Sequence, residues 1–404
     1  MAQDRPATRA RGPQVSYPAP DASGAVRPGG MAMNDLFVGI MSGTSLDGTD
    51  VVLAAFDEAG RPRLRGVASA PFPAGLRSEL LALQVSGGDE LHRAALAANA
   101  LVDFQASLVA RVCSEADVAR DAVTAIGAHG QTVRHRPELG YTLQLNAPAR
   151  LAETCGIPVV SDFRSRDVAA GGQGAPLVPA FHAALFGRHG THRVVLNLGG
   201  MSNVTDLPSA PDVTVRGWDC GPGNVLLDGW VARYRGALFD ADGAWASTGT
   251  VDRALLDRLL DDPWFALAPP KSTGRDRFDL PWLDARLADF EGIDPADVQA
   301  TLATLTALVV VDSIIRHAGA PDALIVCGGG AYNGDLLRRI GLRLVEAGVD
   351  AQVSTSAQEG FAPEHIEALA FAWLAMRCLA HLPGNLPAVT GARGPRVLGA
   401  IHPR

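Results

Sequence analysis

Two segments of this 404-residue chain, residues 36–56 and 193–205, share one pattern: an apolar strand, a polar turn rich in glycine, and a second strand. In the first segment an Asp-Gly pair lies between runs of Val, Ile, Leu and Phe, which predicts a β-hairpin. In the second segment the turn is built on Gly199 and Gly200. Because the two turns lie in different halves of the chain, the pattern favours two similar domains that close on one ligand. Chance similarity between glycine-rich turns is the alternative.

The first turn carries the groups that hold a metal-bound polyphosphate. Glycines at 43 and 48 let main-chain amides approach a ligand closely, and two hydroxyl side chains follow the first of them. Asp47 and Asp50 offer hard oxygens of the kind that position hydrated magnesium. An ordinary hairpin turn favours the same residue types, so the turn alone leaves both interpretations open.

The amino-acid composition of the chain limits the kinds of partner that it can bind. With 47% hydrophobic and 19% charged residues, the chain can form two domains, each with its own core. A formal net charge of -8 without a long basic run argues against nucleic acid or an anionic membrane as the main partner and favours a small polar substrate. The five cysteines are scattered and lack CxxC spacing, which indicates neither a disulfide framework nor a zinc site and fits a reducing cytoplasm.

Residues 1–33 are rich in Pro, Gly, Ala and Arg, which predicts a disordered N-terminal extension, with Met31 or Met33 as alternative starts. The chain contains no run of about 18 apolar residues, so we expect no membrane-spanning helix. A domain boundary is expected near residue 185. It follows a glycine-rich loop at 170–176 that is either mobile or closely approached by other groups.

Further polar segments follow predicted strands or turns. His129, Gln131 and three basic residues after them form a cluster of donors able to grip an anion, or else a solvated turn. Asp219 stands before a Gly-Pro-Gly turn that can expose its carboxylate at a strand end, although an Asp in such a turn is often structural. Three glycines at 328–330 join a strand to a helix, as in a nucleotide-binding turn or a tight structural connection. Glu367 is a carboxylate inside an apolar helix, which is costly unless it is paired or functional.

Several sequence motifs of known enzyme classes are absent, which limits the class of enzyme that this chain can be. Lys271, the only lysine of the chain, precedes Ser272 and Thr273, but Pro270 stands where a Walker A loop needs glycine. The chain also lacks a GxGxxG after a strand, an HExxH and a GxSxG, which argues against a dinucleotide oxidoreductase, a zincin and an α/β-hydrolase. A nucleotide site assembled from several turns remains.

Many separate motifs occur in one order: GTSLDGTD at 43–50, HGQT at 129–132, DFR and AAGGQGAPLVP within 162–179, NLGGMSNVT at 197–205, DCGPGN at 219–224, PPKSTGR at 269–275, CGGGAYN at 327–333, EALAFAWLA at 367–375 and TGARGPRVLGAI at 390–401. Through them the chain resembles, over residues 36–402, the anhydro-N-acetylmuramic acid kinases of the actin, hexokinase and heat-shock-chaperone ATPase superfamily.

The resemblance implies an α/β fold of two duplicated ribonuclease H-like (actin-like ATPase) domains with ATP in the cleft between them. Residues 34–185 would form domain I, completed by the C-terminal segment 365–404, and residues 186–364 would form domain II. It also implies that water opens the 1,6-anhydro ring of anhydro-N-acetylmuramic acid and that the released 6-oxygen takes the γ-phosphate. The product would be N-acetylmuramic acid 6-phosphate, in cell-wall recycling. We expect ATP and Mg2+ as cofactors, a small amino-sugar substrate, and a cytoplasmic homodimer.

The resemblance also implies roles for single residues. Asp219 would be the base that activates water, and Asp47 would hold magnesium through water. The sugar contacts would be His129, Gln131, Arg164 and Glu367. ATP would be bound by three turns, with the last one facing the adenosine: Gly43, Thr44, Ser45, Leu46, Asp47, Gly48, Thr49 and Asp50, then Gly199 and Gly200, then Gly328, Gly329 and Gly330.

Two residues depart from the family pattern, Thr49 and Cys220, where we expect an aliphatic residue and Thr; neither carries a proposed chemical role. Two other functions stay open. A simple hydroxyl kinase of the same superfamily would share the ATP turns and need no water, whereas a chaperone-like ATPase would need no small acceptor. The polar loops around His129 and Gly171 favour an acceptor.

Overall fold

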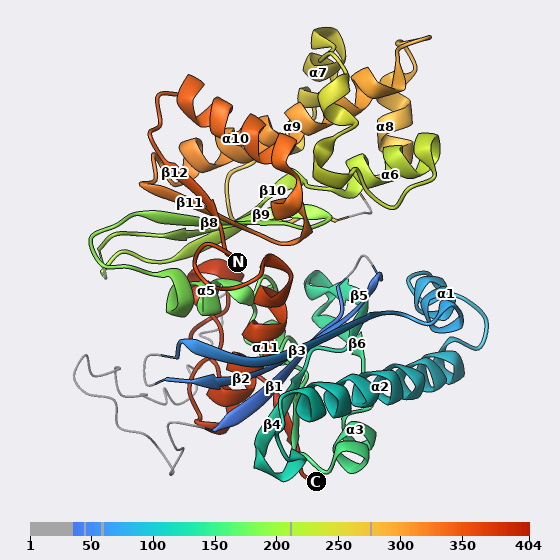
Figure 1. Ribbon diagram of the computed structural model, residues 1–404, viewed down its shortest axis with the longest axis vertical. Coiled ribbons are helices and arrows are strands. Elements are labelled where there is room, and N and C mark those ends of the chain that lie inside the picture. Colours follow the sequence, from blue (N-terminus) through green and yellow to red (C-terminus); the bar gives the residue numbers. More distant parts are fainter. Residues whose placement is uncertain (1–34, 44–45, 58–59, 211, 275–276) are drawn as a thin grey trace, which may run out of the picture.

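The computed structural model describes residues 35–404, except 44–45, 58–59, 211 and 275–276. The extension predicted over 1–33 lies outside the described residues, as do Thr44 and Ser45 of the first turn. The described chain forms two halves, each built around one large β-sheet (Figure 1).

The first sheet consists of β1 (Leu36–Met41), β2 (Gly48–Phe56), β3 (Pro62–Pro71), β4 (Val123–Ala128), β7 (Val159–Ser161) and β13 (Ala400–His402), in the order β13-β7-β4-β1-β2-β3. Strands β1 and β2 form the predicted hairpin, with Met41 opposite Asp50, and β3 continues it in antiparallel direction. Strand β4 runs parallel to β1, β7 runs parallel to β4, and β13 closes the edge antiparallel to β7.

The second sheet repeats this topology. It consists of β8 (Arg193–Leu198), β9 (Met201–Leu207), β10 (Arg216–Pro222), β11 (Ala323–Cys327) and β12 (Gln352–Thr355), in the order β10-β9-β8-β11-β12. Strands β8, β9 and β10 are antiparallel neighbours, while β11 and β12 add in parallel beside β8. The same order and directions describe β3-β2-β1-β4-β7, so the predicted duplication of one α/β unit is confirmed.

Helices cover the outer face of each sheet (Figure 1). In the first half these are α2 (Glu90–Glu115) and α3 (Pro148–Cys155), with α1 (Ala74–Ala82) packed on α2. The short helix α4 (Ser165–Ala169) contacts a small hairpin of β5 (Gln131–Arg136) and β6 (Tyr141–Leu145). In the second half α9 (Pro295–His317) packs on the sheet, and α10 (Gly334–Glu346), α6 (Val225–Arg235) and α7 (Arg253–Leu260) pack on α9, with α8 (Leu280–Leu287) beside α6 and α7. Helix α9 begins as its sequence predicts: Asp294 caps it by accepting a hydrogen bond from the amide of Ala296.

Two helices lie between the sheets, α5 (Val178–Phe186) and α11 (Ile366–Leu379) (Figure 1). Their apolar side chains share one core cluster with residues from both sheets, including Phe37 and Ile325. The backbone of α11 lies very close to the first sheet, because a Cβ on Gly39 of β1 would stand 1.9 Å from the Ala368 carbonyl oxygen. A Cβ on Gly127 of β4 would stand 2.1 Å from the carbonyl oxygen of Phe371. These glycines therefore fix the position of α11.

The chain after α11 stays with the first half, through the short helix α12 (Pro387–Thr390) and the edge strand β13. Proline is favoured in the first turn of a helix, and Pro387 starts α12 here. The domain limits near residues 185 and 365 stay predictions.

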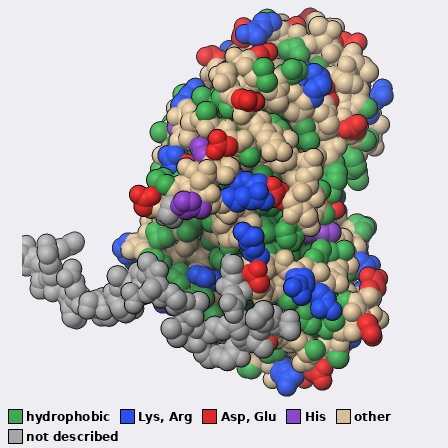
Figure 2. Space-filling view, turned by 60° about the vertical axis from the view of Figure 1, so that its left-hand side comes forward, with side chains coloured by type: hydrophobic (Ala, Val, Ile, Leu, Met, Phe, Trp, Pro, Cys, Tyr) green, Lys and Arg blue, Asp and Glu red, His purple; other side chains and the backbone are tan. Residues whose placement is uncertain are grey.

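Two helices of the described chain, α2 and α9, are long and apolar enough to cross a membrane by length and composition alone. The apolar window of α9 is 78% buried inside the protein and that of α2 is 56% buried, as in core helices. On the face in Figure 2, basic and acidic side chains are interspersed over both halves.

Candidate functional site

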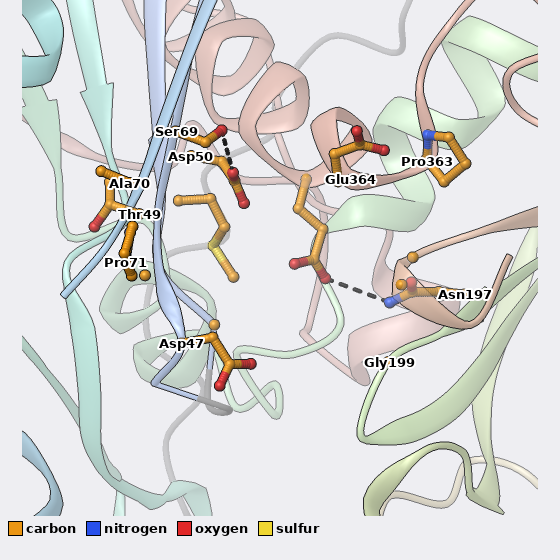
Figure 3. Close-up of a pocket in the computed structure, with 16 residues that line it drawn as sticks. Asp47, Thr49, Asp50, Ser69, Ala70, Pro71, Asn197, Gly199, Pro363 and Glu364 are labelled. Carbon is orange, nitrogen blue, oxygen red and sulfur yellow. Dashed lines mark hydrogen bonds between the residues drawn. The ribbon is translucent and has the colours of Figure 1, made fainter. Parts of the chain in front are cut away.

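One pocket brings together residues from all three glycine-rich turns. It has a volume of about 450 Å³ and is lined from both halves of the molecule. In Figure 3, Asp47 and Asp50 lie on one side of it, and Asn197 and Gly199 lie on the other. The lining residues are Met41, Gly43, Asp47, Gly48, Thr49, Asp50, Ser69, Ala70, Pro71, Asn197, Gly199, Gly328, Gly329, Pro363, Glu364 and Glu367.

The first turn is anchored by Leu46, which has a positive φ of 58°. Its side chain is buried in a small core cluster with Phe72 and Leu80. The Leu46 amide donates to the Gly43 carbonyl oxygen at 3.3 Å, and its own carbonyl oxygen accepts from Arg77 Nε at 2.9 Å. Leu46, which the sequence predicts to bind ATP, therefore holds the turn in place and is not part of the pocket lining.

Four carboxylates, Asp47, Asp50, Glu364 and Glu367, line the pocket, and the lining contains no Lys or Arg. Asp50 accepts a hydrogen bond of 2.6 Å from Ser69 Oγ, its partner on β3. Burial raises the pKa of Asp50, and the Ser69 hydroxyl and the nearby His365 lower it. Such a pocket can hold a polyanion only together with a cation.

The described residues contain no group of three or more His, Cys, Asp or Glu side chains able to hold a metal ion by themselves. This donor set still fits magnesium, which keeps several waters and is bound through one or two carboxylates plus substrate phosphates. Asp47 is exposed at the mouth of the first turn and can serve as such a carboxylate.

The second turn packs against the end of β10. The amide of Gly223 donates to the Gly200 carbonyl oxygen at 2.9 Å, and that of Asn224 donates to the Gly199 carbonyl oxygen at 2.8 Å. A Cβ on Gly223 would lie 2.4 Å from the Gly199 oxygen, so glycine is required there. Gly199 lines the pocket, whereas Gly200 does not.

The third turn has two glycines that packing requires and one that faces open space. Gly328 has φ of +79°, and a Cβ there would lie 2.4 Å from Oδ1 of Asn197. A Cβ on Gly330 would lie 2.6 Å from Cβ of Leu198. No atom lies within 4 Å of a Cβ built on Gly329, which lines the pocket beside Gly328. Gly330 is buried and does not line it.

Glu367, in the first turn of α11, reaches the pocket from between the sheets. Its Oε1 accepts a hydrogen bond of 3.3 Å from Nδ2 of Asn197, drawn dashed in Figure 3. Burial raises the pKa of Glu367, and Asp50 raises it further, while the charge of Arg164 and the Asn197 bond lower it. The structure thus places one predicted sugar contact directly among the predicted ATP-binding residues.

The other predicted sugar contacts do not line this pocket. His129 is buried against the ring of Phe371, and its Nε2 accepts a 3.0 Å hydrogen bond from Nε of Arg164. Burial and the Arg164 charge lower the pKa of His129 well below its usual value, so the imidazole is neutral. Gln131 donates to the Gly43 carbonyl oxygen at 3.2 Å and so supports the first turn. The sugar-binding roles of these three residues stay predictions.

The glycine-rich loop at 170–176 is closely approached by the C-terminal segment. Buried Asp167 accepts hydrogen bonds from the Gly174 amide at 2.8 Å, from Asn385 at 2.6 Å and from Thr390 at 2.8 Å. A Cβ on Gly172 would lie 2.2 Å from an oxygen of this carboxylate. Close packing therefore explains these glycines, and the loop is not part of the pocket lining.

Asp219 lies on β10, the edge strand of the second sheet, and is also outside the pocket lining. Its Oδ2 accepts a 2.8 Å hydrogen bond from the amide of Thr273. Burial raises the pKa of Asp219 to about 7, although the Thr273 amide and the charge of Lys271 lower it. A carboxyl with this pKa can exchange a proton near neutral pH, as a general base must.

Sequence reasoning missed several lining residues, among them Asn197, Ser69 and Glu364. Asn197 lies two residues before Gly199 of the second glycine turn, a position that could have identified it. Ser69 becomes a neighbour of Asp50 only through the register of β2 and β3, which the sequence does not specify.

Comparisons with known proteins identify the family of the chain. The family model described as Anhydro-N-acetylmuramic acid kinase matches residues 35–404. The anhydro-N-acetylmuramic acid kinase of Burkholderia vietnamiensis is 53% identical over 394 residues, covering 98% of this chain and 99% of the relative. That of Cupriavidus pinatubonensis is 54% identical over 379 residues, covering 92% and 100%. Among solved structures, a ROK family glucokinase from Streptomyces griseus in complex with glucose and AMPPNP has a TM-score of 0.39 and 17% identity, covering 85% of this chain and 99% of its own, a likeness too distant to inform the site.

Proposed function

Because the chain belongs to the anhydro-N-acetylmuramic acid kinase family, we propose that it opens the 1,6-anhydro ring of anhydro-N-acetylmuramic acid with water and phosphorylates the 6-oxygen from ATP. The product is N-acetylmuramic acid 6-phosphate, for cell-wall recycling. The observation that carries the proposal is the pocket that the first and second glycine turns line from opposite sides, together with the carboxylates of Asp47 and Glu367.

The phosphate half of the reaction needs positioning and charge neutralisation more than covalent help. Gly43, Gly199 and Gly329 line the pocket, and because glycine has no side chain a nucleotide can approach their main-chain amides closely. Magnesium, held by Asp47 through water, would neutralise part of the phosphate charge. Glu367 lies within the same pocket, where we place the end of the sugar that receives the phosphate.

The ring-opening half needs a base for water. Asp219 accepts a proton from the attacking water as its oxygen bonds to the anomeric carbon, and the bond between that carbon and the 6-oxygen breaks. The freed electron pair on the 6-oxygen attacks the γ-phosphorus, and ADP leaves. Because phosphorus captures the leaving oxygen, one carboxylate with a pKa near neutrality is sufficient on the water side.

A mass measurement with labelled water tests the reaction. The protein is incubated with ATP, Mg2+ and the anhydro sugar in H218O, and the product is analysed by mass spectrometry. We expect one label on the anomeric carbon and none on the phosphate. A simple hydroxyl kinase would leave the anhydro sugar unchanged and phosphorylate only the opened sugar. Either that result or label in the phosphate would contradict the proposal.

Three further expectations belong to this proposal: a cytoplasmic location, a homodimer, and a cleft that closes between the two halves. Size-exclusion chromatography with light scattering measures the dimer. Small-angle scattering measures the closure, because a more compact particle is expected when nucleotide and sugar are both bound.

A further inference from the structure

Lys271 is held in one place although no carboxylate of the described residues pairs with it. Its Nζ donates a hydrogen bond of 3.3 Å to the Phe265 carbonyl oxygen and lies 4.4 Å from the centre of the Trp264 ring. The side chain is half-buried. In a chain that otherwise uses only Arg as its cation, this compact ammonium group is ordered by a carbonyl and an aromatic face.

The same segment contacts Asp219 at two points. The amide of Asp219 donates to the Lys271 carbonyl oxygen at 3.1 Å, and the amide of Thr273 donates to Oδ2 of Asp219 at 2.8 Å. Because β10 is an edge strand, the Lys271 segment fills its free hydrogen-bonding side at this residue. One carboxylate oxygen is thereby fixed, and among the described residues Oδ1 has no hydrogen-bond donor.

We propose that Lys271 is a positioning residue for Asp219: its carbonyl oxygen holds the Asp219 amide, the nearby Thr273 amide fixes one carboxylate oxygen, and its ammonium charge keeps the carboxylate in the anionic form that accepts water's proton. This inference rests on the proposed role of Asp219 as general base. The lysine acts through Asp219 and needs no contact with the sugar.

The charges around Asp219 favour this role for Lys271. Burial raises the pKa of Asp219, whereas the Thr273 amide and the Lys271 charge both lower it. Burial in turn lowers the pKa of Lys271, as does Arg316, while Cys220 and Asp219 raise it. If the Lys271 charge is removed, only the Thr273 amide still opposes the rise that burial causes in the pKa of Asp219.

His317, near the end of α9, is a second titratable side chain whose effect must be separated from that of Asp219. Burial lowers the pKa of His317, and so do the charges of Lys271, Arg316 and Arg216. It is therefore neutral where Asp219 titrates. A His317→Gln variant controls for it.

The segment that carries Lys271 is organised by Asp262, a buried carboxylate with several donors. It accepts hydrogen bonds from the Trp264 amide at 3.0 Å and from Trp282 Nε1 at 3.0 Å. Arg277 at 2.7 Å and Arg286 at 2.8 Å complete its partners. The aromatic platform under Lys271 is therefore fixed independently of the lysine, so replacing the lysine leaves its surroundings in place.

The test is the pH dependence of kcat/KM for the anhydro sugar. In the wild type the rate rises as Asp219 loses its proton, with a midpoint near neutral pH. Lys271→Met keeps a long side chain on the Trp264 ring and removes the charge, so the midpoint should move up by about half a pH unit or more. Lys271→Arg keeps the charge and should retain the wild-type midpoint. The activity lost in Lys271→Met should be largest at pH 6 and smaller at pH 9.

Chemical modification repeats the test on the folded wild-type protein. Because Lys271 is the only lysine, acetylation removes one side-chain charge, and reductive methylation keeps it. Both reagents also modify the N-terminal amine, and acetylation removes its charge too, so acetylated Lys271→Arg, which keeps the charge at position 271, is the control for that effect. Acetylated protein should reproduce the shifted midpoint, and methylated protein should not.

The outcomes separate this inference from the proposed function. One outcome is that Asp219→Asn abolishes the rise of kcat/KM with pH while neither Lys271→Met nor acetylation moves its midpoint. In that case the role of Lys271 is wrong and that of Asp219 stands. A uniform loss at every pH in Lys271→Met would make the lysine merely structural. If Asp219→Asn keeps the wild-type rate and the same rise of kcat/KM with pH, Asp219 is not the general base.

Discussion

Asn197 donates a hydrogen bond to Glu367, with 3.3 Å between Asn197 Nδ2 and Glu367 Oε1. Asn197 stands near the end of β8 in the second sheet, and Glu367 begins α11, the helix that packs on the first sheet. The bond therefore connects the two halves inside the pocket. Any motion that opens or closes the cleft between the halves must change it.

Replacing Asn197 by Ala should lower turnover of the anhydro sugar about five- to tenfold, because a hydrogen bond of about 1 to 1.5 kcal/mol that favours ionised Glu367 is lost. Steady-state kinetics of the purified variant measures this. Gln352→Ala, at an exposed position of the same sheet, is the matched control and should behave as wild type. Turnover of Asn197→Ala within twofold of the control would separate Asn197 from the chemistry.

Asp47→Asn should lower turnover with ATP severely, by about a hundredfold or more, while sugar binding stays nearly intact, because only the magnesium-facing carboxylate is removed. Isothermal titration with the sugar and kinetics at varied Mg2+ measure the two effects. Asp289→Asn serves as the control, because Asp289 is exposed and does not line the pocket. Normal turnover in Asp47→Asn would remove the first turn from phosphate binding.

Local patterns predict the glycine-rich turns because the relevant signals lie within a few residues of each other. The hairpin at β1 and β2 follows from alternating apolar runs around an Asp-Gly pair, and β11 leading into Gly328 follows from a buried strand before glycines. The repeated strand order of the two sheets agrees with the recurrence of these turns. These parts of the fold and site are readable from sequence.

Long-range packing decides what could not be predicted. Glu367 reaches the pocket only because α11 returns to the first sheet over Gly39 and Gly127, far earlier in the chain. His129 is buried against Phe371 of this helix and accepts a hydrogen bond directly from Arg164, two contacts made by residues far apart in the chain. No local pattern reports such contacts.

Gly39→Ala should destabilise the protein by about 3 kcal/mol or more, because the added Cβ would lie 1.9 Å from a carbonyl oxygen of α11 and backbone would have to move. Gly341→Ala is the opposite case: the residue lies inside α10, and no atom lies within 4 Å of its Cβ. Helix propensity then predicts a gain of about 0.5 to 1 kcal/mol. Denaturant unfolding of both variants measures the difference. Equal stability of the two would mean that α11 does not pack this closely.

Asp219→Asn keeps the side-chain shape and the acceptor for Thr273 but removes the basicity. Turnover should fall by at least about a hundredfold while ATP and sugar still bind. Normal affinity for both ligands in titration, together with turnover within a few fold of wild type, would remove Asp219 from its role as the base.

The same substitution makes a second prediction about stability. Burial raises the pKa of Asp219 in the folded protein to about 7 from a value of 3.8, so folding binds a proton between these pH values. Stability of the wild type therefore falls as the pH rises from about 4 to about 7 and levels off above, because the buried carboxylate becomes charged. An Asn side chain is uncharged at these pH values, so burying it does not carry the free-energy cost of a buried charge. The Tm of Asp219→Asn should exceed that of the wild type, by more at pH 8 than at pH 5, and Asp350→Asn, at an exposed position, is measured as the control. A Tm advantage that is equal at both pH values would mean that Asp219 is not held at a raised pKa by burial.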